Sequence, residues 1–111
     1  MSSLTLSTRR DADRLIVSLE GELDLATVPQ LREAAQPALN DPTCTTLVLD
    51  LAGLSFLDST GLGCWIELRN ATENTGKQLV LESVPPSAMR TVAIAGLAPL
   101  FGLDGGARTT V

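Results

Sequence analysis

The sequence has no histidine and no tyrosine, and its 111 residues include one lysine and one tryptophan. Histidine is the usual general base beside a serine nucleophile, so its absence argues against hydrolase chemistry of that kind. Lys77 follows the expected second helix near its far end, which makes it a poor substitute. Asp24 and Asp58 are candidates for an acid/base pair, but no set of cleft-lining residues accompanies them. We therefore predict that the protein is not an enzyme, and we assign no catalytic residue.

Basic residues are also few: eight lysines and arginines stand against thirteen aspartates and glutamates, for a net charge of −5. Polyanion binding requires clustered positive charge, and the chain has only the adjacent pair Arg9-Arg10. No apolar run approaches the ~18 residues that span a bilayer, and the N-terminus lacks the pattern of a secretory signal. We therefore expect a soluble, cytoplasmic protein that binds neither nucleic acid nor membrane.

Signatures of metal and nucleotide binding are missing as well. The two cysteines, Cys44 and Cys64, do not have the spacing of metal ligands and are expected to be reduced thiols. Residues 61–66 lack the third glycine of a dinucleotide fingerprint, and no glycine-rich loop ends in Gly-Lys-Ser or Gly-Lys-Thr. We expect no metal and no cofactor.

The apolar pattern predicts a single α/β domain over residues 1–111, with a core at about 4–103 and a frayed tail at 104–111. Strand patterns recur along the chain, at 4–8, 15–19, 47–51 and 78–82, with 100–103 as an optional fifth strand at the edge. A helix pattern follows each of the last three of these four strands, at about 28–39, 59–73 and 86–95. This order predicts an N-terminal β-hairpin joined to a mainly parallel sheet of four or five strands with three crossover helices.

The sequence also predicts where the second strand ends, how the first helix begins and how the central strand is buried. Residues 20–24 are expected to break the second strand. The first helix then begins with a capping box of Thr27 and Gln30, with Asp24 as the alternative cap. The run 47–51 is almost unbroken, which is typical of a strand buried on both faces, and a loop is expected to follow it.

The most informative stretch comes after this central strand. In the expected loop, Phe56 packs inward. Asp58, Ser59 and Thr60 then place three side-chain oxygens at the start of a helix, where free backbone N–H groups attract negative charge. Because the carboxyl ends of parallel strands share one edge of a sheet, Asp24 and Ser59 are expected to share one surface.

Three stretches together resemble one family: residues 21–24 (Gly-Glu-Leu-Asp), the run 49–63, and residues 95–97 (Ala-Gly-Leu) after the third helix. Their order and spacing are similar to those of STAS domains of the anti-sigma factor antagonist type, which are bacterial regulators. The resemblance covers about residues 4–103. Its most specific part is 56–63, Phe-Leu-Asp-Ser-Thr-Gly-Leu-Gly.

The resemblance implies a protein-binding switch. In such proteins the unmodified antagonist captures an anti-sigma factor and thereby frees the sigma factor. The anti-sigma factor is also a serine kinase whose phosphorylation of the antagonist switches binding off, and a metal-dependent serine phosphatase reverses the step. The motif places the phosphorylated residue at Ser59, with Thr60 as the second candidate. The free protein is expected to be a monomer or a weak dimer. The partner-binding residues that the resemblance implies are Glu22, Asp24, Asp58, Ser59, Thr60, Gly61 and Leu62.

Other interpretations of the same residues stand beside this one. Ser59 and Asp58 are both suitable helix caps, and Asp24 is a suitable turn residue. A STAS domain without kinase control would instead be a docking subunit of another assembly, such as a lipid-transport complex or a stress-signalling scaffold. A sensor of small molecules would be a third class, and it would require ligand binding by the isolated domain.

Overall fold

The structure is a computed structural model that describes residues 2–103, so the predicted tail at 104–111 lies outside the described residues. The elements in chain order are β1 (Leu4–Asp11), β2 (Arg14–Leu23), α1 (Val28–Asn40), β3 (Thr46–Leu57), α2 (Ser59–Asn74), β4 (Gln78–Glu82), α3 (Pro86–Ile94) and the 3-10 turn η1 (Pro99–Phe101). One sheet has the strand order β1-β2-β3-β4, with β1 and β2 antiparallel and the other neighbours parallel. The predicted hairpin, mainly parallel sheet and three helices are confirmed. The prediction that all three are crossover helices is wrong for α3, because no strand follows it within residues 2–103.

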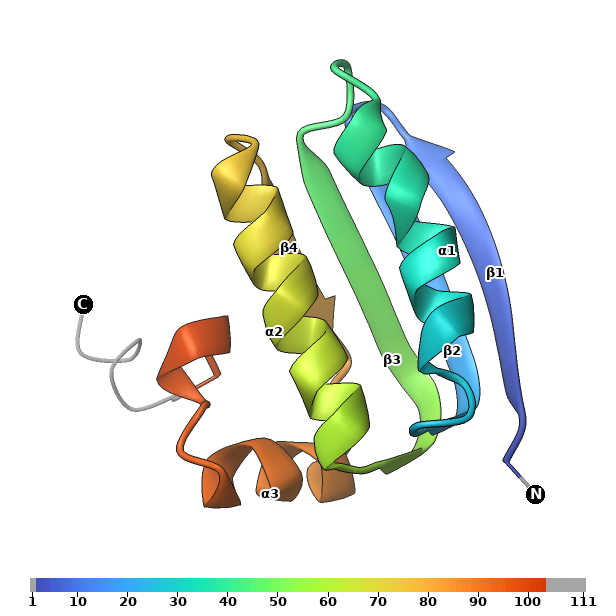
Figure 1. Ribbon diagram of the computed structural model, residues 1–111, viewed down its shortest axis with the longest axis vertical. Helices are drawn as coiled ribbons and strands as arrows, with labels where there is room; N and C mark the ends of the chain where they lie inside the picture. The colour runs from blue at the N-terminus through green and yellow to red at the C-terminus, as the bar shows by residue number, and fades with distance from the viewer. Residues whose placement is uncertain (1, 104–111) are drawn as a thin grey trace.

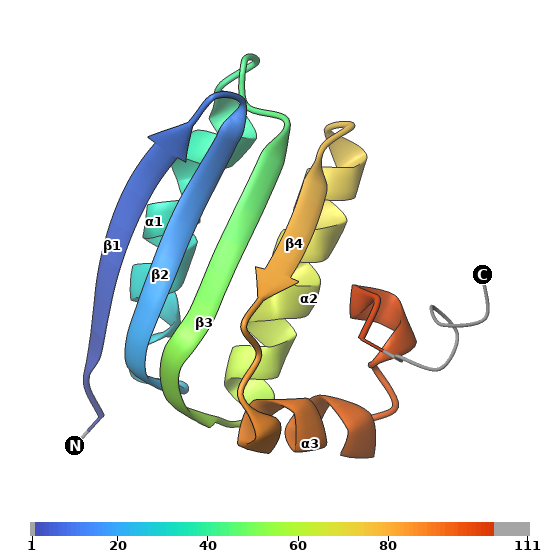
Figure 2. The same ribbon diagram turned by 180° about the vertical axis from the view of Figure 1, so that it is seen from behind.

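The helices are arranged unequally around this sheet. The crossover helices α1 and α2 lie side by side on one face (Figure 1), and the view from behind shows the strands of the opposite face in front of them (Figure 2). Helix α3 follows β4 and lies on the β4 side of the end of the sheet where β2, β3 and β4 finish (Figure 2). We call this end the carboxyl edge. The start of α2 and the whole of α3 therefore meet at the same edge (Figure 1).

The core lies between the sheet and the two crossover helices. Apart from Trp65 and Thr72, its largest fully buried side chains are aliphatic, among them Leu19, Leu23, Leu31, Leu47, Leu49 and Leu51. Val48 points to the opposite face and is nevertheless 0% exposed, because Ile16 and Val80 flank it in register on the neighbouring strands. The central strand is thus buried on both faces at Val48, although helices cover only one of them. Further along the uncovered face Asp50 is half-buried and Ala52 is exposed, so the prediction of a strand buried on both faces holds for only part of the run 47–51.

Strands β2 and β3 are longer than their apolar patterns indicated. Residues 20–24 do not break β2, which passes through two irregularities of register and ends at Leu23. Strand β3 likewise continues through the expected loop to Leu57, which pairs with Leu23. Backbone pairing between the two strands sustains both extensions. Phe56 consequently points outward and is 48% exposed, so the prediction that it packs inward is wrong.

Two other local predictions are also wrong. The hydroxyl of Thr27 donates to the carbonyl of Glu22 at 2.8 Å and makes no side-chain hydrogen bond to the start of α1, so no capping box forms. Residues 100–103 are not a strand, since a 3-10 turn brings Phe101 edge-to-face onto Trp65, with ring centroids 6.2 Å apart. The core thereby gains an aromatic pair at the open side of β4.

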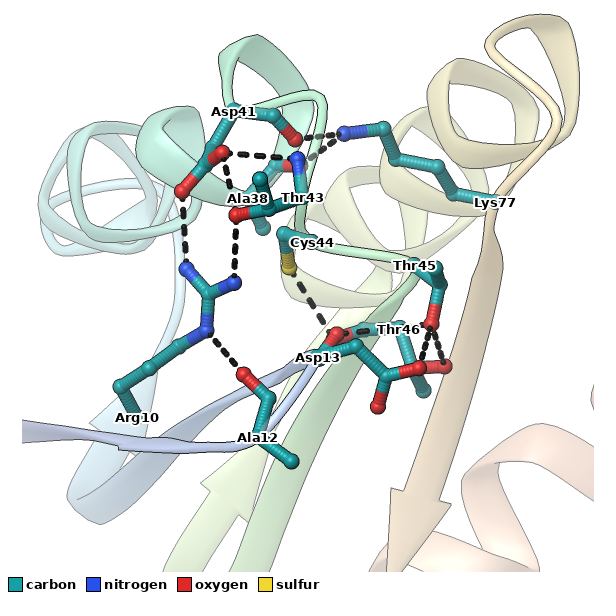
Figure 3. A network of polar contacts seen from close by, with 10 residues as sticks. All are labelled: Arg10, Ala12, Asp13, Ala38, Asp41, Thr43, Cys44, Thr45, Thr46 and Lys77. Carbon is teal, nitrogen blue, oxygen red and sulfur yellow. Dashed lines mark hydrogen bonds and ion pairs between the residues drawn. The ribbon is translucent and has the colours of Figure 1, made fainter.

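A network of polar contacts holds the opposite end of the sheet (Figure 3). The ammonium of Lys77 donates to the carbonyl oxygens of Ala38 at 2.7 Å and Asp41 at 2.6 Å, at the C-terminus of α1. The guanidinium of Arg10 donates to the Asp41 carboxylate at 2.8 Å and to the Thr43 hydroxyl at 2.9 Å. A cation at a helix C-terminus is favoured by the helix dipole. The network therefore joins β1, α1 and the start of β4.

Replacing Lys77 with methionine is expected to lower the free energy of unfolding by about 1–2 kcal/mol, because the carbonyls of Ala38 and Asp41 lose a charged donor while the side-chain volume is kept. Urea unfolding measures the effect. The matched control is Arg9→Met, since Arg9 is exposed and its side chain makes no hydrogen bond or ion pair within residues 2–103. An equal loss in both variants would contradict a specific role for Lys77.

The buried thiol of Cys64 predicts a pH dependence of stability. Burial raises its pKa from 9.0 to about 11. Between these values the unfolded chain has released the proton and the folded chain still holds it, so the free energy of unfolding is expected to fall as the pH rises from 9 to 11. Urea unfolding across this range should show the fall in the natural protein and a weaker one in Cys64→Ala. The chain has no tyrosine and one lysine, so few other side chains titrate there.

Candidate functional site at the start of helix α2

The candidate site lies where β2 and β3 end side by side. Leu23 and Leu57 are paired in register, and each is followed directly by an aspartate, Asp24 or Asp58. The backbone N–H of Asp58 donates to the carbonyl of Leu23 at 3.4 Å. The sequence prediction that these two loops share one edge is therefore confirmed. The two carboxylates come from positions far apart in the chain.

Asp58 is the residue that caps α2. It has an extended backbone, its side chain accepts a hydrogen bond from the N–H of Gly61 at 2.8 Å, and its carbonyl accepts from the N–H of Leu62 at 3.0 Å. An aspartate in this position stabilises the first turn both as an acceptor and by its charge. Of the two candidate caps in the sequence, Asp58 takes the role and Ser59 does not.

Ser59 consequently does not cap the helix. It is the first residue of α2, it is exposed, and its hydroxyl makes no hydrogen bond within residues 2–103. No acidic residue lies in the first turn of the helix. The hydroxyl is thus available to a reagent from solution, at a helix terminus that favours negative charge.

The next three residues of the motif turn progressively inward. Thr60 is half-buried, Gly61 is buried, and Leu62 is 4% exposed and belongs to the core. The structure therefore brings Ser59 and Thr60 to the surface and does not bring Gly61 and Leu62 there. A Cβ added to Gly61 would lie 2.8 Å from the carbonyl oxygen of Leu23, so this glycine permits α2 to approach the end of β2 closely.

Asp24 sits in the turn between β2 and α1. Its Oδ1 accepts a hydrogen bond from the N–H of Ala26 at 3.0 Å and lies 3.4 Å from the Thr27 hydroxyl, and its Oδ2 accepts from the Ser2 hydroxyl. The Ser2 hydroxyl has the largest effect on the pKa of Asp24 and, with the Ala26 N–H, lowers it below its ordinary value. Asp24 is half-buried, so its carboxylate is both ionised at neutral pH and accessible. Both the turn role and a surface role fit it.

Glu22 lies one residue inside the end of β2 and is half-buried. Its side chain accepts a hydrogen bond from the N–H of Ser3 at 3.3 Å, and in the sheet it pairs with Phe56. Glu22, Asp24 and Asp58 together make the carboxyl edge acidic where β2 and β3 end.

Three apolar residues around this edge are exposed, and the sequence analysis predicted this for none of them. Among the described residues the large hydrophobic side chains that are exposed are Leu25 at 75%, Phe56 at 48% and Ile94 at 81%. Phe56 and Ile94 line one shallow groove between β3 and α3, together with the guanidinium-bearing Arg90. The signal for Ile94 was its helical phase: Ala88 and Val92 are the buried residues of α3, and Ile94 lies off that face. Clustered exposed apolar side chains mark interaction surfaces.

The part of the chain that the structure describes has neither a cluster of metal ligands nor a helix that could span a membrane. Within residues 2–103 no group of three or more acidic or cysteine side chains is placed to hold a metal ion. In the same part of the chain, no helix has both the length and the apolar character that crossing a membrane requires. Cys44 and Cys64 are free thiols, and both are buried.

Comparison with known proteins identifies the family. The model of the family described as "Mlab, STAS domain" matches residues 6–102. The anti-sigma-B factor antagonist of Staphylococcus aureus is 34% identical over 90 residues, which are 81% of this chain and 82% of that protein. The crystal structure of an anti-sigma factor antagonist from Mycobacterium paratuberculosis has a TM-score of 0.74 at 29% identity, and the match covers 89% of this chain and 83% of that one.

A further solved neighbour is the anti-sigma factor antagonist SpoIIAA in its unphosphorylated form, with a TM-score of 0.72 at 26% identity over 87% of this chain and 84% of that one. SpoIIAA of Bacillus in the phosphorylated form matches with a TM-score of 0.67, also at 26% identity, over 87% and 86% of the two chains. By its sequence, its fold and the motif at the start of α2, the chain belongs to the STAS-domain family of anti-sigma factor antagonists.

Proposed function

We propose that the protein is a partner-switching anti-sigma factor antagonist in which Ser59 carries the switch. The unmodified carboxyl edge binds an anti-sigma factor that is also a serine kinase, and this binding frees the sigma factor. The kinase then transfers the γ-phosphoryl group of ATP to the Ser59 oxygen, with ADP as the leaving group, and binding ends. A metal-dependent serine phosphatase restores the binding form. The protein itself contributes no catalytic residue.

The observation that carries this proposal is the exposed, unengaged hydroxyl of Ser59 directly after the cap Asp58. Because Asp58 supplies the hydrogen bond that the helix start needs, Ser59 can be modified without loss of the cap. The names of the relatives support the partner class, and SpoIIAA, solved with and without phosphate, supports a switch by phosphorylation.

The charge balance at the edge explains how one phosphate would separate two proteins. A phosphate adds about −1.5 to −2 charges at neutral pH. In the free protein this charge is tolerated at the N-terminus of α2. In a closed interface the same charge would have to be desolvated beside Asp58, in a chain whose net charge is already −5. Phosphorylation is thus expected to act on binding rather than on folding.

The test is intact-mass spectrometry of the protein after incubation with ATP and the candidate anti-sigma kinases of its own source. One added phosphate is expected on the natural protein and on Thr60→Ala, and none on Ser59→Ala, which should still bind the kinase. Thr60→Ala is the matched control, because Thr60 is the adjacent hydroxyl and is half-buried. Phosphate on Ser59→Ala would move the acceptor to Thr60 or elsewhere.

A different result would favour the other class of STAS protein. If no candidate kinase adds phosphate and the protein instead forms a stable complex with another assembly, the carboxyl edge is a docking surface without kinase control. Pull-down from the source organism with the natural protein and with Ser59→Asp would then give the same partner, since the charge at residue 59 would not regulate it.

A further inference from the structure

Residues 2 and 3 lie against the end of β2, beside the carboxyl edge. The N–H of Glu22 donates to the carbonyl of Ser3 at 2.9 Å, and the N–H of Ser3 donates to Oε1 of Glu22 at 3.3 Å. These contacts continue the pairing of β1 with β2 beyond its last registered pair, Leu4 with Gly21. Residues 2 and 3 are therefore in direct contact with the proposed docking surface.

Gly21 shapes β2 to receive this segment. Its φ of +115° is a conformation that side chains disfavour, and a Cβ there would lie 2.4 Å from the carbonyl oxygen of Ser3. The glycine thus removes the one atom that would hold residues 2–3 away from Glu22 and Asp24. The position of residues 2–3 therefore depends on the backbone conformation of Gly21 as well as on the hydrogen bonds to Glu22.

The Asp24 carboxylate is held from two sides as a result. Its own turn supplies the donors to Oδ1, namely the N–H of Ala26 and, at longer range, the hydroxyl of Thr27. Within residues 2–103 the donor to Oδ2 is the hydroxyl of Ser2. Removing that hydroxyl would leave Oδ1 as the single fixed oxygen and free the carboxylate to rotate about its χ2.

We propose that Ser2 is a positioning residue of the docking surface: it fixes the Asp24 carboxylate in the orientation that receives a basic side chain of the anti-sigma factor. This inference rests on the proposed function. A carboxylate accepts only. Oδ2 accepts from Ser2 alone within residues 2–103, so it retains a lone-pair direction for an arginine or a lysine. Fixing it beforehand lowers the ordering cost of binding.

The test is a double-mutant cycle on the full chain, read by calorimetry with the anti-sigma factor that binds the natural protein. Ser2→Ala is expected to weaken binding by about fivefold, because the Asp24 carboxylate then has to be ordered when the partner binds. Ser2→Thr keeps the hydroxyl and should restore most of the affinity. In the Asp24→Ala background, Ser2→Ala should have no further effect.

Ser3→Ala is the matched control. Ser3 contacts Glu22 through its backbone alone, so the variant should bind as the natural protein does. A Ser2→Ala protein with unchanged affinity, or with a loss that adds in full to that of Asp24→Ala, would overturn the positioning role while the proposed function stands. Failure of the natural protein to bind any anti-sigma factor would overturn the proposed function and this inference with it.

Discussion

Ser59→Asp is expected to weaken binding of the anti-sigma factor by about 100-fold, while the melting temperature changes by no more than about 2 °C. The substitution places a carboxylate where the kinase would place a phosphate. On binding, that carboxylate has to be desolvated close to Asp58, and like charges at an interface core oppose association. A loss of about 3 kcal/mol corresponds to this factor, because each 1.4 kcal/mol is tenfold in affinity.

The fold should tolerate the same change for a reason visible in the first turn of α2. Asp58 already accepts the hydrogen bond of Gly61, and no acidic residue occupies the turn itself. A negative charge at residue 59 therefore meets the positive end of the helix dipole, which is worth about 0.3–1 kcal/mol in its favour. This gain offsets repulsion from Asp58, so the net effect on the melting temperature is small.

The measurement pairs calorimetric binding with differential scanning calorimetry, and Asn74→Asp is the matched control. Asn74 is exposed at the last turn of the same helix, so the control adds the same charge far from the carboxyl edge. Its affinity should equal that of the natural protein. A fall of the melting temperature by more than 5 °C in Ser59→Asp would show that Ser59 has a structural role, and unchanged affinity would place the interface elsewhere.

The order of elements could be predicted because each one has an apolar face to bury. The stripe of Val28, Leu31, Ala35 and Ala38 on α1 has helical spacing, and all four side chains are buried. Leu79 to Leu81 likewise indicated β4, whose bounds at 78–82 are those predicted. Where burial drives the choice of structure, periodicity is a sufficient signal.

The ends of β2 and β3 could not be predicted in the same way. Glu20 pairs with Gly53, and Gly21 pairs with Leu54. These pairs are held by backbone hydrogen bonds, which are indifferent to the polar or flexible side chains that usually indicate a turn. The consequence is local but important, since the extension of β3 exposes Phe56 at the candidate site.

The sequence singled out some residues of the candidate site and missed others. Ser59 and Asp58 were found because a helix start has its own sequence pattern, and the structure decided which of the two caps the helix. The contact of Ser2 with Asp24 joins residues 22 positions apart, and no local pattern reports such a contact. The exposure of Ile94 was missed for a different reason: an apolar residue on a short helix is usually assigned to the buried face of that helix.

Gly61→Ala is expected to lower the free energy of unfolding by about 2–3 kcal/mol, as overpacking of a tight contact does. The added methyl would lie 2.8 Å from the carbonyl oxygen of Leu23 and 2.8 Å from Cδ1 of Leu57. Leu57 has rotamers with which to respond, but the Leu23 carbonyl belongs to a paired strand and cannot move alone. The start of α2 must shift instead, so the affinity for the anti-sigma factor should fall together with the stability.

Gly63→Ala is the matched control for Gly61→Ala. It measures the general effect of replacing a helical glycine, without the close contact that Gly61 makes with Leu23. A Cβ at Gly63 meets nothing within 4 Å, so here the substitution should raise the free energy of unfolding by about 0.5–1 kcal/mol. Two glycines only two positions apart in one helix are thus expected to respond with opposite signs, and urea unfolding of both variants measures the difference. If Gly61→Ala were also stabilising, the contact with Leu23 would be too soft to fix α2, and the position of Ser59 would have to depend on the Asp58 cap alone. If Gly61→Ala were destabilising with unchanged affinity, the shift of α2 would not reach the binding surface.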